Sequence, residues 1–176
     1  MLYDQALLAR TYLEAYQVTG KAGYAEVARN IFTYVLRDLR DAGGAFYSAE
    51  DAGEVGKEGE FYVWTPEEIK AVVGEEDAAF VMEVLGVTSN GNFENGTTIL
   101  TTAKSPGPSA QMRFDAARAK LLEARTRRKR PHRDDKILTD WNGLMIGALA
   151  YGAKALGEPR YAGEARRAAE FVLSRL

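Results

Sequence analysis

Two segments of the sequence carry the same apolar pattern, and this repeat is the strongest constraint on the fold. In both, apolar or small residues recur at offsets of 0, 4, 7, 8, 11, 12 and 15, the spacing of one face of an α-helix. The first segment runs from Tyr24 to Leu39 and the second from Tyr161 to Leu176, a shift of 137 residues. We therefore expect two equivalent helices, each with one buried stripe.

The same shift extends to the residues before each segment. It aligns "YDQALL" with "DWNGLM" and Gly20 with Gly157, where a glycine would end the preceding helix. The preceding helices, at 3–16 and 144–156, are apolar almost all round, whereas the following helices have a charged back. A helix buried on all sides followed by one buried on one side is typical of inner and outer layers. The predicted repeat unit is a helical hairpin.

Between the hairpins, the sequence predicts short extended runs and short helices. "GGAFYSAED" and "GEFYVWTPEEI" place aromatic and small residues in two runs joined by a polar turn, which favours a β-hairpin. Thr65, Pro66 and Glu68 have the pattern of a helix start with a capping box. Further helices are expected at about 75–85 and 110–129, separated by Asn-Gly turns, a short "TTIL" strand and a Pro/Gly linker.

We expect one incomplete, mainly α-helical domain over residues 1–176. Its predicted parts are a helical hairpin at 1–40, a β-hairpin and short-helix insertion at 41–108, a helix with a basic and acidic loop at 109–138, and a second helical hairpin at 139–176. The first helix begins without an obvious N-cap, and the last has no terminating Gly or Pro. The chain therefore reads as a piece of something longer. A ring of six such hairpins would need on the order of 300 residues.

Composition narrows the classes of function. With 23 basic and 25 acidic residues, the net charge near −2 gives no overall attraction to nucleic acid or to an anionic membrane. The absence of cysteine removes disulfides and thiolate sites and fits a cytoplasmic, reducing compartment. His132 is the single histidine, which excludes multi-histidine metal centres, and we expect no metal or other cofactor. The uncharged run from Gly143 to Ala153 is too short to span a bilayer.

The run "RTRRKRPHR", from Arg125 to Arg133, is the most basic stretch and raises the question of phosphate or nucleic-acid binding. Cations at a helix C-terminus complement the helix dipole, and no aromatic residues interleave with the arginines. We therefore expect a structural or solvated role, with Asp134 and Asp135 as ion-pair partners. His132 is expected to be an exposed loop residue rather than a general base.

The loop "EDAGEVGKEGE" places carboxylates beside the two aromatic runs. Its spacing lacks the regular ligand alternation of an EF-hand, which disfavours calcium. Glu50, Asp51 and Glu60 lie next to "AFYS" and "FYVW", and acids with aromatic faces suit a sugar. Tyr62 and Trp64 are the predicted stacking residues of this wall, although aromatic residues in extended runs more often belong to a core.

The stretch "DDKILTDWNG", from Asp134 to Gly143, precedes the most apolar helix. Thr139 is a competent N-cap, and a carboxylate at Asp140 gains from the helix dipole. Helix initiation does not explain the gathering of the other polar residues and Trp141. In a ring of inner and outer helices, the ends of the inner helices border the central cavity, so acids placed there can face a ligand.

We therefore predict a site in which two aspartates of this stretch act as acid and base. The predicted catalytic residues are Asp135 and Asp140, with Glu50, Asp51 and Glu60 as the opposing wall. The predicted substrate-binding residues are Tyr62, Trp64 and Trp141, which would stack on a sugar, and Lys136, Asn142 and Asp134, which would hydrogen-bond it.

Five stretches together, "MLYDQALL", "GGAFYSAEDA", "EGEFYVWTPEE", "GNFENGTTIL" and "DDKILTDWNGLMI", make the chain resemble the thioredoxin-domain-containing proteins of the spermatogenesis-associated protein 20 type. The resemblance runs in order along nearly the whole chain. It implies a fragment of an (α/α)6 toroid of the six-hairpin glycosidase type, similar to the N-acylglucosamine and cellobiose 2-epimerases. It also implies that the family's thioredoxin-like N-terminal domain and some of the hairpins are missing from this chain. Relatives read close to "SAEDADSEG", whereas Gly53 and Glu54 here replace an Asp and a Ser.

The first functional hypothesis is a carbohydrate-related domain with glycoside hydrolysis by paired carboxylates. That reaction needs carboxyl groups about 5 to 5.5 Å apart for retention, or about 6.5 to 9.5 Å for inversion. Epimerase chemistry is disfavoured, because the resembling epimerases abstract protons with histidines and only His132 is present here. The alternatives are a non-catalytic scaffold or recognition module for a glycan or protein, serving a thioredoxin-like domain, and an incomplete product without activity.

The expected partners follow from the same arguments. A carbohydrate ligand is predicted, and neither nucleic acid nor a membrane is expected. Self-association through bare apolar helix faces is also expected, because apolar patches beyond a few hundred Å² are rarely left exposed.

Overall fold

The computed structural model describes residues 1–54 and 56–175, which form two compact units. The first unit contains Met1–Asp51 and His132–Leu176, and the second contains Ala52–Pro131. Val55 in the acidic loop and Leu176, the last position of the predicted stripe, lie outside the described residues.

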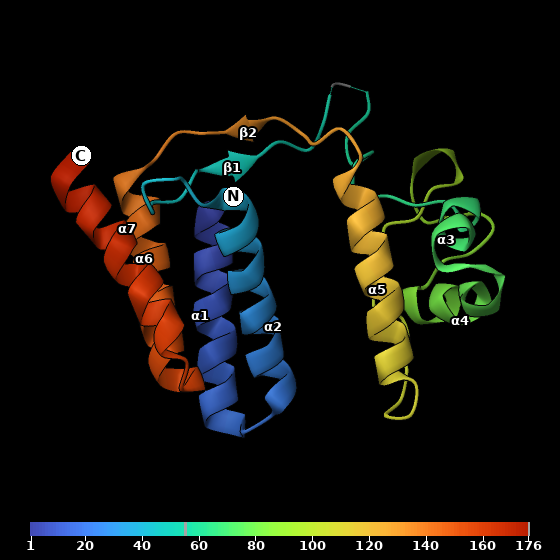
Figure 1. Ribbon diagram of the computed structural model, residues 1–176, viewed down its shortest axis with the longest axis horizontal. Helices are drawn as coiled ribbons and strands as arrows, with labels where there is room; N and C mark the ends of the chain where they lie inside the picture. The colour runs from blue at the N-terminus through green and yellow to red at the C-terminus, as the bar shows by residue number, and fades with distance from the viewer. Residues whose placement is uncertain (55, 176) are drawn as a thin grey trace. The chain divides into compact units, whose positions relative to one another are not determined.

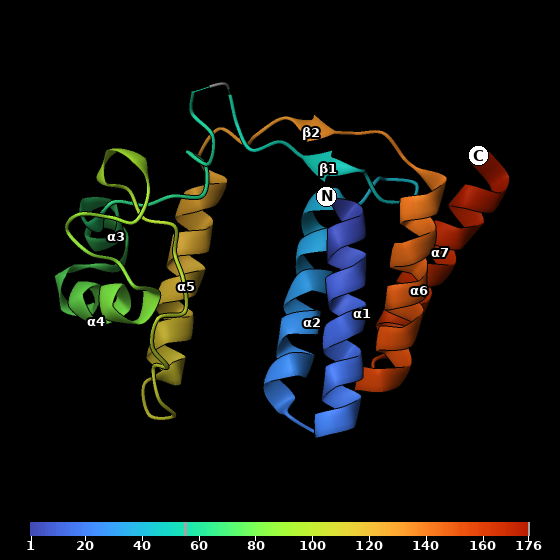
Figure 2. The same cartoon turned by 180° about the vertical axis from the view of Figure 1, so that it is seen from behind.

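Four long helices build the first unit (Figure 1): α1 (Leu2–Thr19), α2 (Ala22–Tyr34), α6 (Thr139–Leu156) and α7 (Pro159–Arg175). A short π-helix, η1 (Val35–Leu39), continues α2. α1 packs against α2, α6 packs against α7, and the two hairpins meet through α1 and α6. The view from behind shows the same order (Figure 2). The mainly α-helical fold and the two predicted helical hairpins are confirmed.

Each hairpin turns at a glycine in the left-handed conformation. Gly20 has a φ of 67° and its N–H donates to the carbonyl of Tyr16, and Gly157 has a φ of 68° and its N–H donates to the carbonyl of Ala153. A side chain at either position would add steric strain, which is why glycine commonly ends a helix in this way. The two positions that the repeat aligns therefore have the same conformation.

The core of the first unit lies between the two hairpins. The rings of Phe32 and Tyr161 lie 4.7 Å apart, joining α2 to α7. Gly152 lets α6 approach this cluster closely, since a Cβ built there would lie 2.5 Å from the Phe32 ring. Buried side chains from all four helices share the cluster: Leu2, Ala6, Ala9, Leu13, Ala28, Phe32, Met145, Ala148, Leu149, Tyr161, Ala165 and Ala168.

Two glycines of α6 are expected to respond in opposite ways to a methyl group. Gly152→Ala should destabilise the first unit by about 1 to 3 kcal/mol, because its Cβ would meet Phe32 at 2.5 and 2.9 Å. Gly147→Ala should stabilise it by about 0.5 to 1 kcal/mol. A Cβ at position 147 would meet no atom within 4 Å beyond the neighbouring residues of its own helix, and alanine is the better helix former. Urea unfolding followed by circular dichroism measures both. Equal effects from the two substitutions would contradict the close approach at Gly152.

The two named strands of the described residues are β1 (Ala49–Glu50) and β2 (Arg133–Asp134), which pair antiparallel. The predicted β-hairpin between the two aromatic runs is wrong, because the first run pairs with the segment before α6. The loop at 52–62 instead curls into turns, in which the N–H of Gly59 donates to the carbonyl of Ala52 at 2.7 Å and that of Tyr62 to the carbonyl of Gly59 at 2.7 Å. These turns prevent the second run from extending along the first.

The second unit packs three helices, α3 (Pro66–Val73), α4 (Glu75–Leu85) and α5 (Gln111–Thr126), with a short 3-10 turn, η2 (Glu94–Gly96). The capping box is confirmed: the Thr65 hydroxyl accepts from the N–H of Glu68, and the Glu68 carboxylate accepts from the N–H of Thr65. Trp64 forms an isolated antiparallel bridge with Thr98, which is all that remains of the predicted "TTIL" strand among the described residues. The main core side chains of this unit are Trp64, Ile69, Val73, Val81, Val84, Phe114, Ala117 and Leu121.

The helix predicted at 110–129 corresponds to α5, and it packs with the two shorter helices α3 and α4. α5 contacts α3 and α4, so residues 52–131 form one body inserted between β1 and β2. The hydrogen bond from the N–H of Asp51 to the carbonyl of His132, at 2.8 Å, joins the two points where the chain leaves and re-enters the first unit.

Candidate functional site

Most of the predicted site residues lie at one end of the first unit, where α1 and α6 begin and β1 pairs with β2 (Figure 1). We call this region the acidic end and define it by Glu50, Asp51, Asp134, Asp135, Asp140 and Trp141. β1 and β2 supply Glu50 and Asp134, and the first turn of α6 supplies Asp140 and Trp141.

Asp140 is exposed in the first turn of α6. One of its carboxylate oxygens accepts a hydrogen bond from the N–H of Trp141 at 2.9 Å. The helix starts at Thr139 with Leu138 in the N-cap position and no side-chain cap bond, so the predicted N-cap role of Thr139 is wrong by one residue. The carboxylate of Asp140 sits where the helix dipole favours negative charge, and it remains accessible to a ligand.

The neighbouring acids Asp134 and Asp135 differ in their surroundings. The ammonium of Lys136 donates to both carboxylate oxygens of Asp134 at 2.6 Å, and this bond holds the pKa of Asp134 below its ordinary value. Asp135 is exposed and makes no hydrogen bond or ion pair with any residue of the described part of the chain. Asp134 and Lys136 therefore neutralise each other, and Asp135 presents the more available carboxylate.

On the β1 side, Glu50 is oriented by a tyrosine. The hydroxyl of Tyr34, at the end of α2, donates to a carboxylate oxygen of Glu50 at 2.8 Å, and Glu50 is half-buried. The next residue, Asp51, is exposed, and its backbone is fixed by the bond to His132. Glu50 is thus held in place by its neighbours, whereas the side chain of Asp51 lies at the surface.

Trp141 contributes an aromatic edge to this region. Its ring lies 4.8 Å from that of Tyr3 in an edge-to-face arrangement, and both rings are half-buried. Each ring comes from the first turn of a helix, Tyr3 from α1 and Trp141 from α6. The acidic end therefore combines carboxylates with a partly exposed aromatic pair.

Asn142 lies in the core instead of at a ligand surface. It is fully buried, its side-chain oxygen accepts from the N–H of Phe46 at 2.8 Å, and its amide group donates to the carbonyls of Phe46 and Leu138 at 2.9 and 3.0 Å. These bonds use both amide protons. The predicted sugar contact of Asn142 does not fit this placement, and the residue supports the loop before β1.

The remaining predicted residues, Glu60, Tyr62 and Trp64, belong to the second unit. Trp64 is only 2% exposed, and the guanidinium of Arg128 covers its ring at 4.0 Å. Tyr62 is half-buried, with its ring perpendicular to that of Phe61 at 4.9 Å. Trp64 therefore acts as a core residue and has no open face for stacking, whereas Glu60 is exposed.

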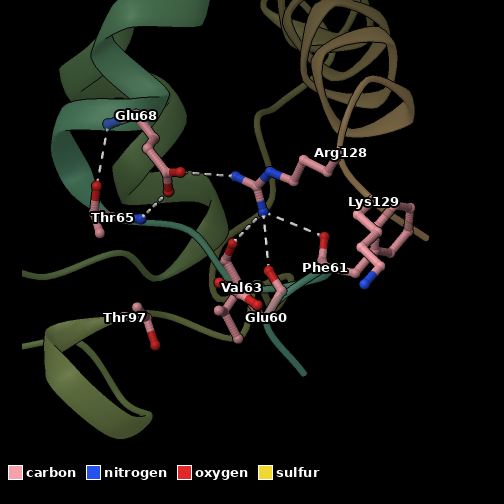
Figure 3. A pocket seen from close by; sticks show the side chains of 8 residues that line it. All are labelled: Glu60, Phe61, Val63, Thr65, Glu68, Thr97, Arg128 and Lys129. Atoms are coloured by element: carbon pink, nitrogen blue, oxygen red, sulfur yellow. Dashed lines mark hydrogen bonds and ion pairs between the residues drawn. The ribbon is translucent and has the colours of Figure 1, made fainter. Parts of the chain in front are cut away.

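Glu60 lines a cavity of about 430 Å³ in the second unit (Figure 3). Apolar atoms come from Phe61 and Val63, and the other lining residues are Thr65, Glu68, Thr97, Arg128 and Lys129. The guanidinium of Arg128 donates to the carbonyls of Glu60, Phe61 and Val63 at 3.4, 3.2 and 2.7 Å and to the Glu68 carboxylate at 3.1 Å. Lys129 is paired with Glu54. Arg128, Glu68 and Lys129 around this cavity are therefore already paired with groups of the protein.

The basic run has a structural role, as predicted, but with other partners. Arg128 binds the loop at 60–63 of the second unit, and Arg127, just after α5, pairs with Glu123 of that helix. Arg133 stacks on the ring of Tyr47 at 4.2 Å. Neither predicted partner, Asp134 or Asp135, forms an ion pair with an arginine in the described residues. His132 is exposed in the loop, as predicted.

Two further properties of the described residues bear on the class of protein. No helix among them is both long and apolar enough to cross a membrane. No group of three or more carboxylate or imidazole side chains in residues 1–54 and 56–175 is arranged to hold a metal ion.

Comparison with known proteins gives relatives along nearly the whole chain. No family profile matches. Over 98% of its length the chain is 35% identical to spermatogenesis-associated protein 20 of Homo sapiens and 34% identical to that of Mus musculus, and it is 29% identical to an uncharacterized protein of Caenorhabditis elegans. The chain spans 26% of the length of the human and mouse relatives. For the stretch of sequence that the chain contains, these matches support the spermatogenesis-associated protein 20-like family.

Proposed function

We propose that the chain is part of a carbohydrate-related (α/α) toroid of the six-hairpin glycosidase type, with the acidic end bordering its sugar site. Two features support the toroid: the helical hairpins repeat, and they meet through their inner helices, α1 and α6. These helices begin at the same end of the unit (Figures 1 and 2). In such a ring, the ends of the inner helices border the central cavity.

The observation that best supports a sugar ligand is that two exposed aspartates, Asp135 and Asp140, lie at the same end of the unit as the half-buried ring of Trp141. Asp135 makes no hydrogen bond or ion pair among the described residues, and Asp140 is exposed although it accepts one backbone hydrogen bond. Carboxylates accept hydrogen bonds from sugar hydroxyls, and an indole face stacks on a pyranose ring. Trp141 adjoins Asp140 and supplies that face.

Glycoside hydrolysis is the reaction that this site would perform. In our proposal Asp135 is the acid that protonates the leaving oxygen, and Asp140 is the carboxylate that acts as base or nucleophile on the other side of the sugar ring. Glu50, held by Tyr34, would bind a hydroxyl from the opposing wall. The separation of the two aspartates in the complete protein would decide between retention and inversion.

The second candidate is a recognition module that binds a glycan or protein without chemistry and serves a thioredoxin-like domain. One observation favours it: Asn142, Asp134 and Lys136 are engaged within the fold, so fewer polar groups remain to stabilise a transition state. Exposed carboxylates with one aromatic edge are sufficient for binding.

Titration of the natural protein with a panel of mono- and oligosaccharides, followed by calorimetry, tests the proposal. Asp135→Asn and Asp140→Asn are each expected to weaken binding of a captured sugar by about tenfold, because a charge-assisted hydrogen bond is lost. Asp115→Asn, on the exposed surface of α5, is the matched control and should change nothing.

The release of reducing ends, measured on the same sugars, separates the two candidates. Product release that both Asn variants abolish supports hydrolysis, and binding without product supports the recognition module. A protein that binds no sugar, or whose affinity for sugar is indifferent to both substitutions, contradicts the proposed site.

A further inference from the structure

The contact between α1 and α6 follows the register of the internal repeat. Tyr3 meets Trp141 with ring centroids 4.8 Å apart, and the guanidinium of Arg10 lies 3.6 Å from the centroid of the Tyr151 ring. Further along, a side-chain carbon of Leu13 lies 3.4 Å from the Cβ position of Gly152. The two helices run parallel, and the residues that meet are separated in sequence by nearly the repeat shift of 137 residues. The second hairpin therefore stands beside the first as the next member of a series.

The two helices use different faces in this contact. The buried stripe of α1 is Leu2, Ala6, Ala9 and Leu13, and that of α6 is Met145, Ala148, Leu149 and Gly152. Both stripes lie in the core that the two helices share, where Leu13 meets Gly152. A contact between unlike faces of equivalent units is heterologous. In this contact, α6 does not use the face that corresponds to the contact face of α1, and α1 does not use the face that corresponds to the contact face of α6.

The repeat identifies these two remaining faces by residue. On α6, the equivalents of the α1 contact residues form what we call the α6 face: Thr139, Gly143, Ile146 and Ala150. On α1, the equivalents of the α6 contact residues form the α1 face: Leu8, Thr11, Tyr12 and Ala15. Leu8 is 48% exposed, and Thr11, Thr139, Gly143 and Ala150 are exposed as well. Tyr12, Ala15 and Ile146 are half-buried, and Tyr12 and Ile146 pack in part against the core of their own unit. Both faces are uncharged, and each has the pattern that its counterpart uses inside the unit.

We propose that the α6 face of one copy of the chain packs against the α1 face of a second copy. This contact would repeat the α1 to α6 packing between chains, in the same register. Because the faces are unlike, the association is head to tail, and each added copy presents a fresh face for the next. The inference concerns the isolated chain and does not rest on the proposed sugar site, although Asp140 of that site adjoins Thr139 at the edge of the α6 face.

Charge and size complementarity support a second copy as the occupant. Within the chain, the Tyr151 hydroxyl donates to Gln17. The repeat equivalents of this pair are Glu14 and Lys154, so opposite charges would meet between copies, with Lys154 joining the pair that Glu14 already makes with Arg10 of its own helix. Leu13 and Gly152 have Ala150 and Ala15 as equivalents, two small residues that allow close approach of the helices.

The outer helix gives a further indication. Leu173 of α7 is 87% exposed, whereas its repeat equivalent, Leu36, packs against the core of the first unit. In the proposed contact a neighbouring copy would cover Leu173, as the core of the first unit covers part of Leu36. One feature opposes the contact: Asp140 would face Asp4, since these are the equivalents of Tyr3 and Trp141. Asp4→Asn is therefore expected to strengthen association.

Light scattering and sedimentation of the chain as a function of concentration test the proposal. The wild-type chain is expected to associate. Leu8→Glu, which places a charge on the α1 face, and Ala150→Glu, which places one on the α6 face, are each expected to weaken association by about tenfold or more. Mixed together, the two variants should form a one-to-one dimer that grows no further, because each retains the face that the other lacks. Met112→Glu, at an 83% exposed position of α5, is the matched control.

A charge exchange provides a second test that leaves both apolar faces intact. Glu14→Lys and Lys154→Glu should each weaken association, and the double variant should restore it, with circular dichroism verifying the fold of each protein. A wild-type chain that stays monomeric at high concentration would overturn the proposal. So would association that survives both Leu8→Glu and Ala150→Glu, or variants that fail to pair when mixed.

Discussion

Asn142→Ala is expected to lower the free energy of unfolding of the first unit by about 3 to 5 kcal/mol. The substitution leaves the N–H and carbonyl of Phe46 without partners in a fully buried position, and the carbonyl of Leu138 loses one of its two donors. Each buried polar group left unpaired costs about 1 to 3 kcal/mol. The loop before β1 would lose its attachment to the start of α6, so the acidic end would loosen as well.

Chemical denaturation of the chain measures this effect. Two further variants serve as a control and as a test of the hydrogen-bond explanation. Asn30→Ala, at an exposed position of α2, should change stability by less than about 0.5 kcal/mol. Asn142→Asp preserves the size but replaces the donor by an acceptor that faces the Phe46 carbonyl, so it should be at least as damaging as Asn142→Ala. A mild effect of both Asn142 variants would mean that the loop finds other partners.

Arg128→Ala is expected to destabilise the second unit by about 2 to 4 kcal/mol. The guanidinium binds three carbonyls of the loop at 60–63, pairs with the carboxylate of Glu68 and covers the ring of Trp64. Its side chain is 22% exposed, so these bonds are largely shielded from water. A lysine has no planar fork of donors, and Arg128→Lys should therefore recover only a small part of the loss.

The neighbouring residue supplies the control for this prediction. Arg127 is 75% exposed and pairs only with Glu123 among the described residues, so Arg127→Ala should cost less than about 0.5 kcal/mol. A Trp141→Phe background leaves Trp64 as the single tryptophan, so its fluorescence reports the unfolding of the second unit. If Arg127→Ala and Arg128→Ala unfolded with the same denaturation midpoint, the loop at 60–63 would not depend on Arg128 for its stability.

The helical hairpins were predictable because their signals are local. Apolar spacing within 16 residues defines α2 and α7, and one glycine marks each turn. The capping box at Thr65 and Glu68 is equally local, since both partners lie within one helical turn. Such patterns depend on neighbouring residues alone, and the structure confirms them.

The pairing of β1 with β2 was not predictable in the same way. Each strand has two residues, too few for a periodic pattern, and the partner lies beyond the whole second unit. The sequence offered a nearer partner in "FYVW", and the competing turns around Gly59 prevent that pairing. Two-residue strands take their register from the fold that brings them together.

The sequence predicted that acidic and aromatic residues gather where α6 begins, but it did not predict the contacts that each of them makes. Asp140 and Trp141 lie in the first turn of α6, as the repeat indicated. The role of Asn142 depends on Phe46, 96 residues earlier, and that of Arg128 on carbonyls 65 to 68 residues earlier. Polar residues that bind distant backbone look, in sequence, the same as residues that bind a ligand. Burial in the folded chain separates the two.

The insertion of the second unit between β1 and β2 sets an order for folding during synthesis. Residues 52–131 are contiguous, so this unit is complete once Pro131 has left the ribosome. α1 and α2 emerge before the second unit, whereas Gly152 of α6, which lies beside Leu13 and Phe32, is made more than 100 residues later. The hairpin of α1 and α2 therefore cannot bury these side chains against α6 until the second unit has been made.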